Sequence, residues 1–127
     1  LLFGSVAAYF YKVTGDKAYL NMVKRVADVV RDHVWPDKFV VNSLASNLQF
    51  SLDAYEILGD KRMYEKAKKL ADIGIRTLWS GKLFVREPND PYYEAKLGTN
   101  ALVAGFLRLH YLEKNNPAAA SISRWSL

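Results

Sequence analysis

The chain has 127 residues, of which 50% are hydrophobic and 24% charged, and its formal net charge is +5. This length and composition are ordinary for one soluble globular domain with a buried core. The absence of cysteine excludes disulfides and thiolate metal sites, and no apolar run approaches the roughly 20 residues that a membrane span needs. A reducing compartment suits such a chain, so the cytoplasm is favoured, although the sequence leaves the localisation open.

The first predicted helix covers about residues 2–13 and is apolar on almost all sides. The chain opens inside this pattern and without a Met, so we expect further sequence upstream. A turn follows at Gly15, where glycine suits a left-handed conformation, and Asp16 is expected to cap a second helix over about 17–34. The apolar residues of this second helix recur at helical spacing on one face and are Leu20, Val23, Ala27, Val30 and Val34.

The hairpin repeats along the chain. Gly15-Asp16-Lys17 recurs 44 residues later as Gly59-Asp60-Lys61, and the same offset relates Trp35 to Trp79. The second copy predicts helices over about 44–58 and 61–78, and a fifth helix is expected over about 96–114. The first helix of each pair carries little charge and is expected to lie inside, whereas the second is amphipathic and is expected to lie outside. The prediction is an all-α fold of antiparallel helical hairpins with period 44, in a domain spanning 1–116 with a tail at 117–127.

The connectors from each outer helix to the next inner helix are long, about 36–43 and 80–94. Each contains a short β-prone run, 38–41 in the first and 82–85 in the second, for which we expect small extended or hairpin elements. Long loops on one rim of a helical array are common places for function. The connector rim is therefore the predicted location of a binding site.

Two stretches, AAYFYKVTGDKAYLNMVKRVA and DAYEILGDKRMYEKAKKLA, carry a likeness to a known architecture. They resemble the hairpin turns of the six-hairpin, or (α/α)6, toroid superfamily, which includes N-acylglucosamine 2-epimerase-like proteins, unsaturated glucuronyl hydrolases and polysaccharide lyases. The resemblance covers about residues 2–114, which is part of a toroid. It implies a carbohydrate-active parent protein, a hydrolase, lyase or epimerase, that binds a sugar or oligosaccharide at a mouth lined by inner helices and connectors.

The second connector supplies the strongest candidates for chemistry. Its carboxylates could act as general acid and base in glycoside chemistry, and these are Glu87, Asp90 and Glu94. The neighbouring candidates for substrate binding are Arg86, Tyr92, Tyr93 and Lys96, joined by Asn42 and Asn47 near the first connector. The alternative is an ordinary polar loop that is restricted by its prolines, with Asn42 or Ser43 serving as a helix cap. No metal-ligand spacing occurs, and no cofactor is expected.

The two histidines are further candidates, because the resemblance to epimerase-like proteins implies histidines as acid and base. His33 and His110 both fall near helix ends, where a structural role is favoured, and neither is expected to face the connector rim.

The rival function is a non-catalytic helical-repeat module that binds a protein, and the sequence leaves open whether this chain is an enzyme. The basic stretch 61–76 is interspersed with acids, so it is interpreted as a solvated outer face, with neither nucleic acid nor a membrane as partner. Terminal repeats normally need polar covers, yet the two predicted end flanks are apolar. We therefore expect self-association, or further sequence, to cover Leu2, Phe3, Val6, Tyr9 and Phe10 at one end and Phe106, Leu107 and Leu109 at the other.

Overall fold

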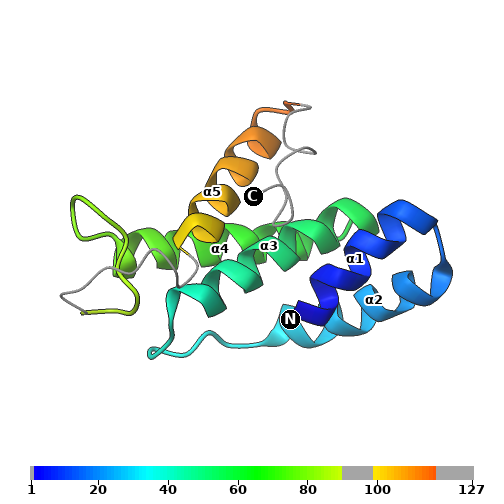
Figure 1. Cartoon of the computed structure of the whole chain (residues 1–127), viewed down its shortest axis with the longest axis horizontal. Helices are drawn as coiled ribbons and strands as arrows, with labels where there is room; N and C mark the ends of the chain where they lie inside the picture. Colours follow the sequence, from blue (N-terminus) through cyan, green and yellow to red (C-terminus); the bar gives the residue numbers. More distant parts are fainter. Residues whose placement is uncertain (1, 90–98, 117–127) are drawn as a thin grey trace.

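The computed structural model describes residues 2–89 and 99–116, and within these ranges it contains five α-helices and no sheet (Figure 1). This confirms the predicted all-α class. Two antiparallel hairpins are followed by a helix that crosses them steeply, and none of the described helices is long and apolar enough to span a membrane. The helices are α1 (Leu2–Thr14), α2 (Lys17–Asp32), α3 (Val41–Leu58), α4 (Lys61–Leu78) and α5 (Thr99–Glu113).

The two hairpin turns have the same local construction. Gly15 and Gly59 adopt φ values of 70° and 67°, in the left-handed region that favours glycine. The next residue caps the following helix, because Asp16 Oδ1 accepts from the Ala18 N–H at 2.8 Å and Asp60 Oδ1 from the Arg62 N–H at 3.0 Å. Both predicted turns and both predicted caps are confirmed.

The core is organised around α3, which contacts all four other helices. One apolar cluster joins α3 to α4 and α5, and a second joins it to α1, α2 and the start of α4. The central position of α3 explains why its sequence is apolar on almost every side. Its buried residues are Val41, Leu44, Ala45, Asn47, Leu48, Gln49, Phe50, Ser51, Leu52, Asp53 and Ala54.

The predicted small hairpin occurs in the second connector but not in the described part of the first. The second forms a small hairpin, in which Trp79 and Phe84 make an antiparallel bridge and the Val85 N–H donates to Leu78 O at 2.9 Å. The first forms no such pairing with any described residue, and Val41, which belongs to its predicted extended run, is the first residue of α3. Val34 was placed on the buried face of α2, but α2 ends at Asp32 and the Val34 side chain is 85% exposed.

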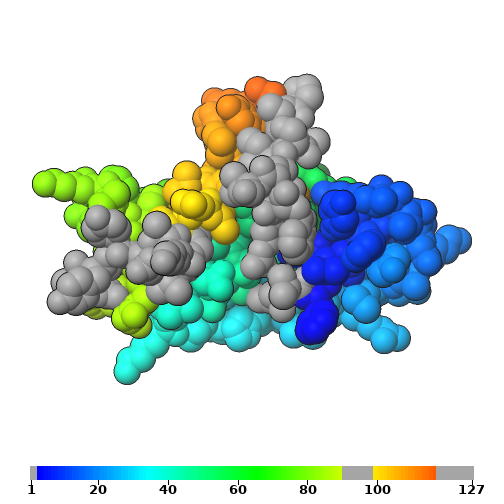
Figure 2. Space-filling view, viewed as in Figure 1, coloured from blue at the N-terminus to red at the C-terminus, as the bar shows by residue number. Residues whose placement is uncertain are grey.

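The end flanks are exposed on α1 and partly covered on α5. Phe3, Tyr9 and Phe10 are exposed on α1, which is the dark blue surface in Figure 2. On α5, Leu107 is exposed but Leu109 is buried. Phe106 is half-buried, with its ring 5.4 Å from that of Phe84. The expectation of an uncovered flank at α5 was therefore wrong for Leu109, because that side chain belongs to the core around α3 and α4.

The cap at Asp60 has a further role that Asp16 lacks. Arg31 Nη2 lies 2.9 Å from Asp60 Oδ2 and Arg62 Nε lies 3.1 Å from Oδ1, and the Asp60 side chain is only 16% exposed. The hydrogen bond from Arg62 lowers the pKa of Asp60 below its ordinary value, against the opposing effect of burial, with backbone and charge interactions acting in the same direction as Arg62. Asp60 therefore ties the end of α2 to the start of α4.

Replacing Asp60 by asparagine is expected to cost about 1–2 kcal/mol of unfolding free energy at neutral pH, because the cap survives but two charge-assisted bonds are lost. A lowered folded-state pKa means that this stability is present at neutral pH and is lost as acid protonates Asp60, below its ordinary pKa of about 3.9. Urea titrations at several pH values measure both effects. Asp16→Asn is the matched control, since Asp16 forms no ion pair in the described ranges. Equal losses in the two variants would contradict the proposed tie.

Candidate functional site

The two connectors meet at the start of α3. The Val41 N–H donates to Arg86 O at 2.6 Å, and an N–H in the first turn of a helix has no acceptor within that helix. This bond fixes the second connector against the beginning of α3. Asn42, Arg86 and Glu87 therefore belong to one rim of the molecule, which also contains the end of α2.

The predicted rim residues differ in their surroundings. Asn42 is exposed in the first turn of α3, and neither it nor Ser43 caps that helix, because the N-cap residue is Val40. Arg86 Nη2 forms an ion pair with Glu87 Oε1 at 2.6 Å, and both side chains are partly exposed. The other candidates in this connector lie outside the described residues, and these are Asp90, Tyr92, Tyr93, Glu94 and Lys96.

Asn47 lies at a pocket of about 470 Å³ between α2 and α3, which we call the rim pocket. The Asn47 side chain is buried, and its amide nitrogen donates to Ser43 O at 2.9 Å. Three valines from α2 supply an apolar wall, and two potentially cationic side chains stand beside them. The lining residues among those described are Arg25, Val26, Val29, Val30, His33 and Asn47. A mostly apolar pocket with a few polar groups is the usual form of a small-ligand site.

His33 lies at the end of α2 as predicted, but the expectation that it does not face the connector rim was wrong. It is the C-cap of α2, its side chain is exposed, and it lines the rim pocket. The first connector begins at His33, so His33 lies on the connector rim. The available signal was its position between the last apolar residue of α2 and Pro36, which marks the end of a helix.

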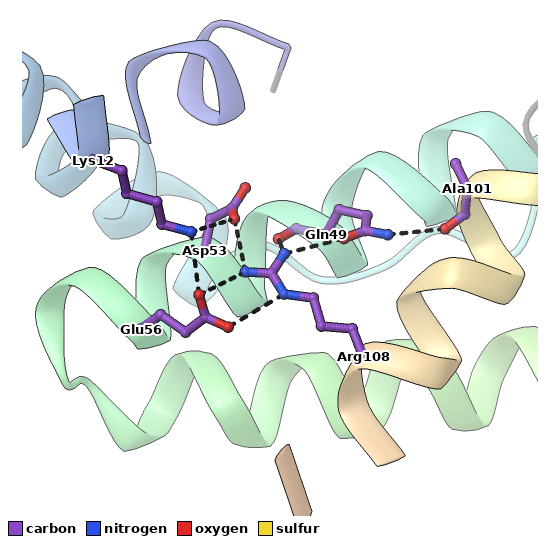
Figure 3. A network of polar contacts seen from close by, with 6 residues as sticks. All are labelled: Lys12, Gln49, Asp53, Glu56, Ala101 and Arg108. Atoms are coloured by element: carbon purple, nitrogen blue, oxygen red, sulfur yellow. Dashed lines mark hydrogen bonds and ion pairs between the residues drawn. The ribbon is translucent and has the colours of Figure 1, made fainter. Parts of the chain in front are cut away.

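A second polar cluster lies toward the opposite end of α3 and was not predicted. Arg108 of α5 is 1% exposed, and its Nη2 atom lies 2.8 Å from Asp53 Oδ1 and 3.0 Å from Glu56 Oε2 (Figure 3). Its Nη1 atom donates to Gln49 Oε1 at 3.1 Å, and Gln49 Nε2 donates to Ala101 O. Lys12 of α1 approaches the same two carboxylates. We call Lys12, Gln49, Asp53, Glu56 and Arg108 the inner-helix network.

The inner-helix network is balanced in charge. Burial lowers the pKa of Arg108, but the carboxylates of Asp53 and Glu56 more than offset this, so the pKa stands above its ordinary value. Two acids on α3 face one base from α1 and one from α5, and these charges satisfy one another. The arrangement fits a structural link between three helices better than a site for an ionic ligand.

A search for metal-ligand clusters and comparisons with known proteins complete the description of the site. In the described part of the chain, no group of three or more histidine or acidic side chains is placed to hold a metal ion. Comparisons with protein-family models, with curated proteins and with solved structures found no match. In the described ranges the chain is therefore an all-α protein of two helical hairpins and a fifth helix, with the rim pocket between α2 and α3.

Proposed function

We propose that this chain forms part of a carbohydrate-binding site at its connector rim, within a carbohydrate-active protein of the hydrolase, lyase or epimerase kind. The observation that supports this most is the rim pocket. It brings Asn47, a sugar-binding candidate from the sequence, beside Arg25 and His33. An amide, a guanidinium and an imidazole are suitable partners for sugar hydroxyls and carboxylates. The valines of α2 could cover the apolar face of a sugar ring.

The charge of the rim pocket favours an acidic sugar. Arg25 forms no ion pair with any described residue, and no acid is among the described residues that line the pocket. A guanidinium without a carboxylate partner can bind a carboxylate in a bidentate manner. A uronic acid is therefore a better ligand for this pocket than a neutral hexose. Of the three predicted acid–base candidates, Glu87 is the one within the described residues, where it forms an ion pair with Arg86.

Arg25→Gln is expected to weaken the binding of glucuronate about tenfold, because a charge-assisted hydrogen bond at a partly exposed site is lost. Calorimetric titration with glucuronate, and with glucose as the neutral analogue, measures this difference. Lys24→Gln is the matched control, since Lys24 is an exposed base on the same helix that does not line the pocket. Equal affinity for the acid and the neutral sugar, or equal losses in both variants, would count against a uronate site.

The non-catalytic interaction module remains a second proposal, favoured by the apolar flank of α1. Phe3 and Val13 are 78% and 64% exposed, and Tyr9 and Phe10 are also exposed. Several large apolar side chains on one helix suggest a surface that a partner, a second copy or further sequence covers. The same titration separates the two proposals, because a pure interaction module would respond to neither sugar.

A further inference from the structure

A second groove lies on the other side of the end of α2. It has a volume of about 730 Å³ and runs between residues 31–35 and the first three turns of α4. We call it the basic groove, because five bases and only two acids are among the described residues that line it. The bases are Arg31, Lys61, Arg62, Lys66 and Lys69, and the acids are Asp32 and Glu65.

Part of this charge is already neutralised. Arg31 and Arg62 both bind the carboxylate of Asp60, and Arg31 also binds Asp28. Glu65, one of the two acids of the groove, forms an ion pair with Lys68, whose Nζ atom lies 3.0 Å from Glu65 Oε1. The remaining excess of positive charge therefore belongs to the lysines of α4.

The lysines of the basic groove have no carboxylate partners among the residues that the structure describes. Neither Lys61 nor Lys69 forms an ion pair in the ranges that the structure describes, and Lys66 donates only to the backbone carbonyl of His33. Burial lowers the pKa of Lys66, and repulsion from Lys69 adds to this effect while Asp32 opposes it. The repulsion from Lys69 reflects the concentration of bases on this side of α4. A carboxylate placed here would gain charge-assisted hydrogen bonds without displacing an existing partner.

Apolar side chains also line the basic groove. Val34 is 85% exposed, and the half-buried side chains of Trp35 and Ile73 line the same groove, whereas Leu70 beside them is buried in the core. Along α4 the groove extends from Lys61 to Ile73, which is about 18 Å at the helical rise. That length accommodates roughly five residues of an extended chain at about 3.3 Å each. One small anion would leave most of it empty.

We propose that the basic groove binds an extended acidic peptide segment of a partner protein, with its carboxylates on Lys61, Lys66 and Lys69 and its apolar side chains on Val34 and Ile73. A polyuronate has carboxylates but no apolar side chains to cover Val34. A single-stranded nucleic acid needs an open aromatic surface for stacking, whereas the ring of Trp35 is packed edge-on against Phe39 and His33. The acidic peptide satisfies both parts of the surface.

This proposal does not depend on the rim pocket. Arg25 and Asn47 do not line the basic groove, and Lys61 and Lys69 do not line the rim pocket. His33 lines both sites, but substitution of Arg25, or of Lys61 and Lys69, removes a group from only one of them.

The test is fluorescence anisotropy with a labelled peptide of repeated Asp-Glu-Leu triplets. We expect binding that weakens with added salt and that falls about tenfold in the double variant Lys61→Gln/Lys69→Gln, since exposed charge pairs contribute up to about 1 kcal/mol each. The control is Lys24→Gln/Lys82→Gln, which removes the same charge from exposed positions outside the groove and should change affinity less than about twofold. Val34→Ser should weaken binding severalfold, because an exposed apolar contact is lost.

Three results would overturn the proposal. Equal losses in the two double variants would show that only the net charge matters. An unchanged affinity in Val34→Ser would remove the apolar contact from the site. Tighter binding of oligogalacturonate or of a thymidine oligonucleotide than of the peptide, at the same salt concentration, would assign the groove to a different class of partner. Circular dichroism of each variant confirms that all of them fold.

Discussion

Replacing Arg108 by methionine is expected to lower the free energy of unfolding by about 3–5 kcal/mol, because removal of one partner leaves buried carboxylates without compensation. Arg108 is 1% exposed, and it is the only base from α5 in the inner-helix network. Lys12 approaches the same acids from α1, but it is itself 40% exposed and cannot replace the hydrogen bonds inside the core. Urea unfolding measures the loss as a lower midpoint at an unchanged slope.

A matched control and a rescue variant make this expectation specific. Arg76 forms an exposed ion pair with Asp72 one turn earlier on α4, so Arg76→Met should cost no more than about 0.5 kcal/mol. Adding Asp53→Leu and Glu56→Gln to Arg108→Met should recover most of the loss, since replacing a whole buried charge cluster by uncharged groups is often neutral. If Arg108→Met costs no more than Arg76→Met, the network does not stabilise the fold.

The features that the sequence predicted well are those decided by neighbouring residues. The turns at Gly15 and Gly59, with caps at Asp16 and Asp60, depend on backbone conformation and on bonds spanning two residues. Apolar periodicity likewise placed the buried face of α2 at Val23, Ala27 and Val30. It failed at Val34, because the spacing of apolar residues does not show where a helix ends.

The inner-helix network was not predicted, because its partners are distant in the chain. Arg108 binds Glu56 and Asp53, which precede it by 52 and 55 residues. A signal was nevertheless available. Lys12 is the only charge on α1, and Asp53 and Glu56 are the only charges on α3. Isolated charges on otherwise apolar helices must find partners when they are buried, so Arg108 on α5 was the natural counterpart.

Among the described residues, Asn47 is the one predicted binding residue that lines the rim pocket. Asn47 was chosen from the sequence, and it lies in the rim pocket, whereas Arg25 and His33 were not chosen for that role. The reason is geometric. The pocket is formed by one face of α2 against α3, whereas the residues predicted from the sequence lie in or near the connectors and not in the middle of α2. The tie between Val41 and Arg86 was also invisible in the sequence, although it is what brings the two connectors together.

The second large loss of unfolding free energy is expected from substitutions where α1 crosses α3. Phe50 is completely buried, and a Cβ atom on Gly4 would lie only 2.6 Å from its Cε2 atom. Phe50→Ala is expected to cost about 3–5 kcal/mol through lost burial and a cavity. Gly4→Ala alone should cost up to about 2 kcal/mol, because the overlap outweighs the roughly 1 kcal/mol that alanine gains in a helix.

The double variant Phe50→Ala/Gly4→Ala should cost at least about 1 kcal/mol less than the sum of the two single changes. Without the Phe50 ring, the new methyl group meets Val26 at 2.9 Å and otherwise enters space that the ring had filled. Pairing Gly4→Ala with Leu78→Ala supplies the control, because Leu78 belongs to the other apolar cluster and its cost should add within about 0.5 kcal/mol. Urea titrations of all the variants give the coupling energies. If the free-energy costs of Gly4→Ala and Phe50→Ala were strictly additive, α1 would not approach α3 through Gly4. The close crossing would then not set the distance between the first hairpin and the central helix.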